Sequence, residues 1–141
     1  MKNLLYFILL IVSVSSFAQT GADTLTYSID KKCEQCLDTS LVKTLDMMNC
    51  FAVARDSWAK EITKYYNLLM VKLKPEQKEK LIAAQKEWVT FKEKEFDLSN
   101  SIYYDEEQGR EKRIDAVSRQ AQLVKERALD LKMYYDLYFE K

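Results

Sequence analysis

The residues with the clearest chemical potential are three cysteines, Cys33, Cys36 and Cys50. Cys33 and Cys36 form a CxxC, the spacing at which thiol oxidoreductases hold a redox pair with a lowered thiolate pKa. Such motifs usually open a helix after a strand, and no strand pattern precedes this one. An odd count allows at most one bridge within the chain. The pattern therefore favours one structural disulfide to Cys50 and a spare thiol over redox chemistry.

Other catalytic chemistry is poorly supported. The chain has no histidine, which removes Ser-His and Cys-His pairs and most zinc sites. Carboxylates are numerous, but the sequence places none of them in an apolar pocket. The balance of 22 Lys and Arg against 22 Asp and Glu argues against nucleic acid as the main partner. We therefore expect no catalytic residues, no metal and no cofactor, and a protein rather than nucleic acid as partner.

The N-terminus has the features of an export signal. Lys2 precedes an apolar run from Leu4 to Val14, and Ser16 and Ala18 are the small residues of a signal-peptidase site. A membrane span needs about 20 apolar residues, so this run is too short for a good anchor. No cysteine directly follows the cleavage point, which disfavours a lipid anchor. We expect residues 1–18 to be a signal peptide and the protein to be periplasmic or secreted, without a stable membrane anchor.

The pattern of the rest of the chain predicts one domain. Residues 19–28 are polar and small, which predicts a flexible linker. Residues 29–141 contain one proline, Pro75, and one glycine, Gly109, and both fall between periodic segments. So few turn residues disfavour sandwiches and barrels, and 12% aromatic residues are ample core material.

Three segments show helical periodicity. Their expected core positions are Met48, Phe51, Ala54 or Arg55, Trp58, Ile62, Tyr65 and Leu69, then Leu81, Ala84, Trp88, Phe91, Glu95 or Phe96, Leu98 and Ile102, then Ile114, Val117, Ala121, Val124, Ala128, Leu131, Tyr135 and Tyr138. Charged residues between the last set, including Arg127 and Lys132, are expected on a solvated face. The prediction is an all-α fold, an antiparallel three-helix bundle with one disulfide staple and room for a short extra N-terminal helix between Cys36 and Cys50.

Several residues together carry a resemblance to a known family. They are Cys36 and Cys50, Trp58, Glu61-Ile62, Tyr65–Met70, Leu73–Gln77, Leu81, Gln85, Trp88, Phe91, Glu95-Phe96, Gly109 and Val124–Leu129. This pattern resembles the LprI-like family, whose shared region is called the lysozyme inhibitor LprI-like N-terminal domain and is also catalogued as an exported bacterial domain of unknown function. The resemblance covers about residues 29–138.

The resemblance implies roles for individual residues. It pairs Cys36 with Cys50 and leaves Cys33 as the extra thiol, a bridge that would add about 3 kcal/mol of stability. Structural family anchors are Trp58, Tyr66, Gln85, Trp88 and Arg127. Gln85 shares a helix face with Trp88, and Arg127 is expected to pair with Glu87, Glu95 or Asp97 across the bundle.

Three positions depart from the family pattern, and the second cysteine pair of many members is missing. One of the three positions is Thr63, where the family often has Asn. The family usually has Asp near the first tryptophan, where this chain has Ala59, and Arg four residues after the second, where it has Lys92. Lys cannot reproduce the bidentate fork of Arg.

The function implied by the resemblance is inhibition. An exported helical module of this type would bind a lysozyme or another cell-wall hydrolase and block its cleft. The best candidate contact is the connection between the second and third long helices, because it offers tyrosine anchors and acidic residues that attract a basic enzyme. The candidate residues are Tyr103, Tyr104, Asp105, Glu106 and Glu107. The alternative is a cell-envelope structural or interaction module with an unknown protein partner and no inhibitory activity.

Overall fold

The computed structural model describes residues 22–39, 43–104, 109 and 112–139. These residues form four helices and no strand, so the all-α prediction is confirmed. The helices are α1 (Ala22–Thr39), α2 (Thr44–Lys72), α3 (Pro75–Tyr103) and α4 (Lys112–Phe139). Within the described residues, no helix is long and apolar enough to cross a membrane. The expected signal peptide, residues 1–18, lies outside them.

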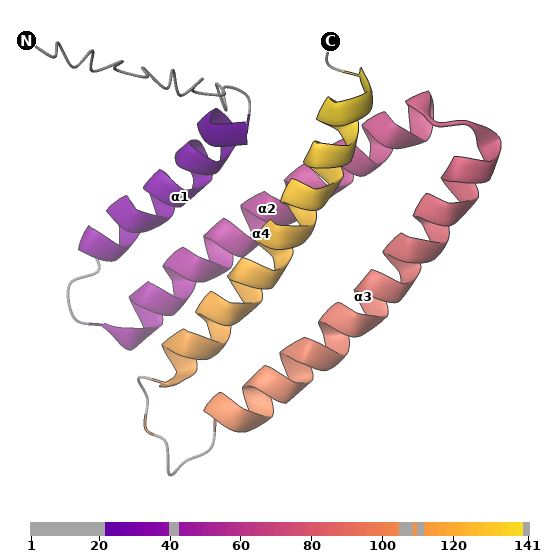
Figure 1. The fold of residues 1–141 in the computed structure, drawn as a ribbon. Helices are drawn as coiled ribbons and strands as arrows, with labels where there is room; N and C mark the ends of the chain where they lie inside the picture. Colours follow the sequence, from indigo (N-terminus) through magenta and orange to yellow (C-terminus); the bar gives the residue numbers. More distant parts are fainter. Residues whose placement is uncertain (1–21, 40–42, 105–108, 110–111, 140–141) are drawn as a thin grey trace, which may run out of the picture.

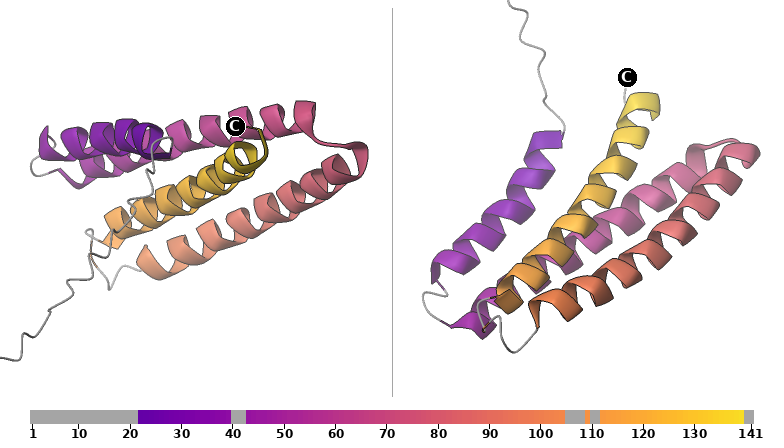
Figure 2. Two further views of the ribbon diagram at one scale, coloured as in Figure 1. Left: turned by 45° about the horizontal axis from the view of Figure 1, so that its top comes forward. Right: turned by 60° about the horizontal axis from the view of Figure 1, so that its bottom comes forward.

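Helix α4 contacts each of the other three helices. In Figure 1 the chain reverses direction from each helix to the next. Helix α4 packs along α2, with α1 on one side and α3 on the other (Figures 1 and 2). Helix α3 packs on α4 and touches α2 little beyond the hairpin that joins them. The predicted bundle of three long helices with an extra N-terminal helix is therefore present in outline.

The hairpin between α2 and α3 begins and ends where the sequence indicated. Leu73 adopts an extended backbone and donates its N–H to the carbonyl of Leu69 at 2.9 Å, which closes α2. The Lys74 N–H donates to the side-chain oxygen of Gln77 at 3.1 Å, which caps the start of α3. Pro75 then occupies the first helical turn, where its missing N–H costs nothing.

The N-terminal region differs from the sequence-based prediction. Helix α1 begins at Ala22, so residues 22–28 are helical rather than a linker. The extra helix does not lie between Cys36 and Cys50, because α1 already contains Cys36 and α2 already contains Cys50. The physical reason is that no glycine or proline interrupts residues 22–44, so polar composition alone does not stop the helix.

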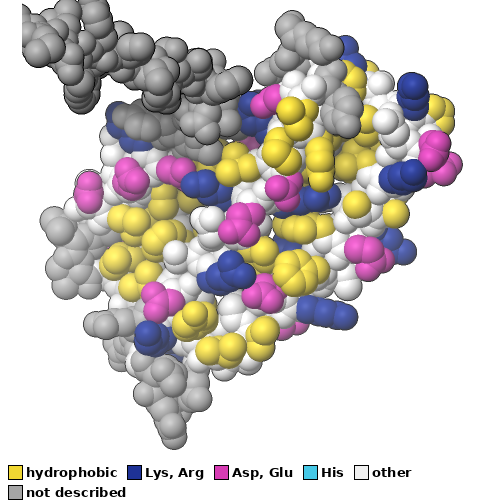
Figure 3. Space-filling model, viewed as in Figure 1, with side chains coloured by type: hydrophobic (Ala, Val, Ile, Leu, Met, Phe, Trp, Pro, Cys, Tyr) yellow, Lys and Arg dark blue, Asp and Glu magenta, His cyan; other side chains and the backbone are white. Residues whose placement is uncertain are grey.

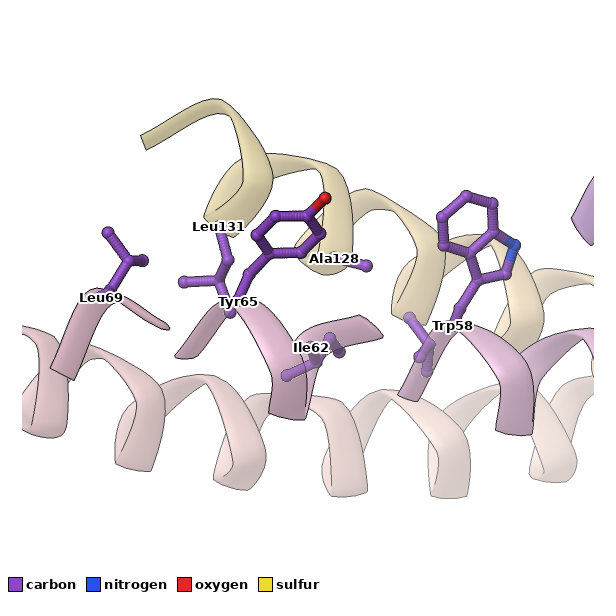
Figure 4. Close-up of a cluster of buried hydrophobic side chains, with 7 residues drawn as sticks. Trp58, Ile62, Tyr65, Leu69, Ala128 and Leu131 are labelled. Carbon is purple, nitrogen blue, oxygen red and sulfur yellow. The ribbon is translucent and has the colours of Figure 1, made fainter. Parts of the chain in front are cut away.

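The apolar core lies between α2 and α4, as their periodicity predicted. Trp58 is 1% exposed and Leu131 is fully buried. Figure 4 shows Tyr65 and Leu69 of α2 beside Leu131 of α4, with Trp58 further along α2. The buried cluster comprises Trp58, Ile62, Tyr65, Leu69, Val124, Ala128 and Leu131. Each large side chain buried here contributes about 1.5–3 kcal/mol.

The predicted core face of α3 is wrong at several positions. Phe91, Leu98 and Ile102 are half or more exposed, and Ala84 is exposed as well. The face toward the bundle instead carries Leu81, Gln85, Trp88, Lys92, Phe96 and Ser99. The two stripes have the same helical spacing and share Leu81, Trp88 and Phe96, which the prediction gave as an alternative to Glu95, so periodicity alone could not choose between them. The more polar stripe faces inward, and an apolar stripe is left on the outside.

The predicted solvated face of α4 is also wrong at Lys132. Its side chain is 6% exposed and forms an ion pair with Asp136, one turn further on. Its ammonium nitrogen lies 5.8 Å from the centre of the Tyr65 ring. A buried ammonium group needs such partners, because removing it from water without them is costly.

Candidate functional site

Three of the expected family anchors meet between α3 and α4. Arg127 Nε donates a hydrogen bond to the side-chain oxygen of Gln85 at 3.0 Å. The Arg127 guanidinium carbon lies 5.9 Å from the centre of the Trp88 ring. Burial lowers the pKa of Arg127, and the nearby Asp130 and Tyr134 partly oppose that effect. The family residues of α3 and α4 therefore form one contact across the seam.

The partner of Arg127 differs from the expectation. The prediction offered Glu87, Glu95 or Asp97, whereas the structure shows the neutral amide of Gln85. Glu95 interacts instead with Arg119 at 3.5 Å. Arg127 lies on the face of α4 that packs against the first half of α3, where Gln85 is the polar residue within reach.

The other two anchors belong to the apolar core. Trp58 is buried in the α2–α4 cluster, and Tyr66 is partly buried against that cluster. Lys125 lies 5.6 Å from the Trp58 ring centre and also forms an ion pair with Asp30 at 2.6 Å. This ion pair fastens α1 to α4 above the tryptophan.

A groove lies between α2 and α3, with α4 as its floor. Its volume is about 430 Å³. It is lined by Arg55, Asp56, Ala59 and Ile62 of α2, Trp88, Lys92 and Phe96 of α3, and Val124 of α4. Ala59 and Lys92, two of the three positions that depart from the family pattern, both line it, whereas Thr63 does not. Its walls combine apolar and aromatic side chains with two cations.

The two cations of the groove are held differently. Arg55 donates to Asp56 at 3.3 Å and to the side-chain oxygen of Gln120 at 3.2 Å. Lys92 lies 5.9 Å and 5.7 Å from the ring centres of Trp88 and Phe96. Within the described part of the chain, no carboxylate oxygen lies within 4.0 Å of its ammonium group.

Sequence reasoning did not find this groove. A signal was present, because Trp88, Lys92 and Phe96 follow one another at i, i+4 spacing and so share a helix face. The prediction assigned both aromatic residues to the core and noted Lys92 only as a departure from the family pattern, not as part of a site. What the sequence could not show is that α2 and α3 lie apart at this level, which is a property of the tertiary packing.

The predicted partner-binding connection is only partly described. Tyr103 is half-buried at the end of α3, and Tyr104 is 38% exposed. The Arg113 guanidinium carbon lies 5.3 Å from the centre of the Tyr104 ring. Gly109 has a φ of +80°, a backbone conformation that favours glycine. Asp105, Glu106 and Glu107 lie outside the described residues.

The cysteines pair as the resemblance implied. Cys36 and Cys50 form a disulfide that joins α1 to α2, with 5.7 Å between their Cα atoms. Cys33 is the free thiol, and its Sγ lies 3.8 Å from the Cys50 carbonyl oxygen. Burial raises the pKa of Cys33, and Asp30 and Glu34 raise it further. A redox-active thiolate needs a lowered pKa, so these surroundings argue against that chemistry.

Comparisons with known proteins agree with the resemblance. A family model described as "Lysozyme inhibitor LprI" matches residues 36–131, a range that begins at the first bridged cysteine and ends at Leu131 in the core. The description is that of an inhibitor rather than an enzyme. Neither the search of curated proteins nor the search of solved structures found a match. Since the family model covers well over half of the chain, the protein belongs to the LprI family.

Proposed function

We propose that this protein is an exported binding module that inhibits a lysozyme, or another cell-wall hydrolase, by occupying its cleft. The observation that carries the proposal is the family match over residues 36–131. The stapled helical fold supports it, because a rigid scaffold lowers the entropy lost when a contact loop binds. The N-terminal pattern of residues 1–18 supports export.

The proposed contact is the connection between α3 and α4. Tyr104 is partly exposed, and its ring lies against Arg113, so an aromatic anchor is available with restricted freedom. On the face seen in Figure 3, basic and acidic side chains are interspersed with hydrophobic ones. With a formal net charge of zero, attraction to a basic enzyme must come from a local group of charges. Asp105, Glu106 and Glu107 would supply it.

Calorimetry with one c-type and one g-type lysozyme tests the proposal, with turnover assayed on the same samples. We expect a Kd of about 1 μM or tighter for at least one enzyme and a matching loss of turnover. Tyr104→Ala and Asp105→Ala should each weaken binding by about tenfold, equal to about 1.4 kcal/mol. Glu79→Ala, an exposed residue near the other end of α3, is the matched control and should change nothing.

Two results would contradict the proposal. No heat and full turnover with both enzymes would remove the inhibitor function and favour the alternative of an envelope interaction module with another protein partner. Binding without loss of turnover would contradict occupation of the cleft. The export step has its own test, because the mature protein recovered from the periplasm or medium should begin at Gln19.

A further inference from the structure

We propose that the groove between α2 and α3 binds a small amphipathic anion, a molecule with one anionic head group and an apolar body. The proposal rests on the groove alone and does not depend on lysozyme inhibition. The contact proposed above lies at the connection after Tyr103, whereas the groove lies along Arg55–Ile62 of α2 and Trp88–Phe96 of α3. Either proposal can therefore fail without the other.

The head group is identified by Lys92. Its ammonium group lies near the Trp88 and Phe96 rings, and its side chain is partly buried in the groove wall. Among the described residues no carboxylate forms an ion pair with it. A partly desolvated cation held near aromatic rings, without an ion pair to a described carboxylate, gains most from an anion supplied by a ligand.

Arg55 provides a second cation that is already positioned. Gln120 is 6% exposed and accepts a hydrogen bond from Arg55, while its own amide nitrogen donates to Asn100 at 2.9 Å. This chain of contacts fixes the guanidinium in the groove wall. A guanidinium has five N–H donors, and the contacts to Asp56 and Gln120 use two of them. The acidic residue of the lining, Asp56, is thus paired with Arg55, and the balance of the groove is one positive charge.

The apolar body is identified by the remaining lining. Ile62 and Val124 are buried residues at the base, and Trp88 and Phe96 supply aromatic surface. A volume of about 430 Å³ lies within the usual range of small-molecule sites, about 300–1,000 Å³. Apolar walls with a few placed charges are the general composition of such sites. Inorganic anions would leave this surface unfilled, whereas a neutral apolar molecule would leave Lys92 unpaired.

A matched pair of fluorescent probes tests the charge requirement. The anion 8-anilinonaphthalene-1-sulfonate and the uncharged N-phenyl-1-naphthylamine share one aromatic framework and differ in the sulfonate. We expect the sulfonate probe to bind the oxidised protein at least about tenfold more tightly, and its affinity to fall as salt is raised. Decanoate should displace it, and decanol should not.

Variants locate the probe. Lys92→Gln should weaken the sulfonate probe by about tenfold and leave the neutral probe unchanged, while Lys92→Arg should retain binding. Lys94→Gln is the matched control, because Lys94 is exposed on α3 and does not line the groove. Leu98→Ala tests the exposed apolar stripe of α3 as a competing site, and it should have no effect.

Three outcomes would overturn the proposal. Equal affinity for both probes would mean that they bind an apolar patch and that the charge of the sulfonate has no role in binding. Unchanged sulfonate binding in Lys92→Gln would place the anion elsewhere, and loss of binding in Leu98→Ala would place it on the outer face of α3. Failure of both probes to bind the oxidised protein would remove the site altogether.

Discussion

The contacts of α4 with α2 and with α3 are built from different kinds of side chain. At its contact with α2, which we call the α2–α4 seam, α4 packs apolar side chains that are almost fully buried, such as Val124, Ala128 and Leu131. At its contact with α3, which we call the α3–α4 seam, α4 presents hydrogen-bonding and charged side chains. Their contacts are Arg127 with Gln85, Gln120 with Asn100 and Ser99, and Arg119 with Glu95.

The difference indicates that the two seams contribute unequally to the stability of the fold. A buried leucine contributes about 1.5–3 kcal/mol, whereas a hydrogen bond contributes about 0.5–1.5 kcal/mol net. The α2–α4 seam, fastened to α1 by the disulfide, therefore carries most of the stability. Directional contacts hold α3 in register, and this arrangement leaves its outer apolar stripe exposed and the groove open. We expect α3 to open locally at a lower free energy than α2 and α4.

The largest expected effect comes from a matched pair of leucines. Leu131→Ala removes a fully buried side chain from the α2–α4 seam and should lower the free energy of unfolding by about 4 kcal/mol. Leu98 is 52% exposed on the outer face of α3. Leu98→Ala should therefore cost less than about 0.5 kcal/mol, apart from the small change in helix propensity between leucine and alanine. Urea unfolding of both variants measures the difference. Similar losses in both would mean that α3 contributes a core of its own.

Removal of the disulfide tests whether the attachment of α1 to α2 contributes to the stability of the fold. Replacing Cys33 and Cys36 with serine together removes the bridge and any substitute for it, and should cost about 3 kcal/mol by the loop-entropy model. Cys33→Ser alone keeps the bridge and should cost less than about 1 kcal/mol. Urea unfolding of the oxidised proteins gives both values. A double variant as stable as the single one would mean that the bridge does not stabilise α1 on α2.

Substitution of two glutamines of α4 tests the contribution of the α3–α4 seam to stability. Gln120→Ala leaves Arg55 and Asn100 without their shared partner and should cost about 2 kcal/mol. Gln122→Ala removes only an exposed contact with Glu126 and should cost less than about 0.5 kcal/mol. Thermal unfolding at one protein concentration compares them. Equal costs would show that the Gln120 network does not hold α3.

The smallest effect concerns Cys33. Its raised pKa, caused first by burial and then by Asp30 and Glu34, means less thiolate at neutral pH. Alkylation by iodoacetamide should therefore be several-fold slower at pH 7 than for the thiol of glutathione, and its rate should rise at a higher pH than the rate for glutathione. Glu34→Gln should speed it modestly. The same shift contributes stability that is complete below the unfolded-state pKa and lost as pH rises through the folded-state pKa.

A fast reaction at pH 7 would contradict this view of Cys33. It would indicate a lowered pKa and reopen the redox hypothesis for the CxxC motif. The exposed thiol of glutathione, alkylated under the same conditions, is the reference for the rate.

Sequence alone predicted some elements well for identifiable reasons. In α2 and α4 one apolar stripe faces one apolar partner, so periodicity and burial agree at Trp58, Ile62 and Leu131. In α3 two stripes share Leu81, Trp88 and Phe96, and the choice between them at the other positions depended on polar contacts that no helical period records. The start of α1 was missed because a polar segment without glycine or proline can still be helical.

The candidate site was predicted unevenly for similar reasons. The disulfide and the importance of Gln85, Trp88 and Arg127 followed from the family resemblance, whereas the contact between Gln85 and Arg127 required the tertiary structure. The groove depends on the distance between α2 and α3, which local sequence does not encode. Tyr104 stays a prediction, made from its place in a connection between helices, where binding residues often occur.

Hydrogen exchange with and without a c-type lysozyme tests the central claim most directly. In the free protein, amides of α3 should exchange faster than those of α2 and α4. With lysozyme present, protection should appear in peptides that span the end of α3, the connection and the start of α4, and should be absent from α1 and α2. No added protection, or protection confined to α1 and α2, would contradict the account.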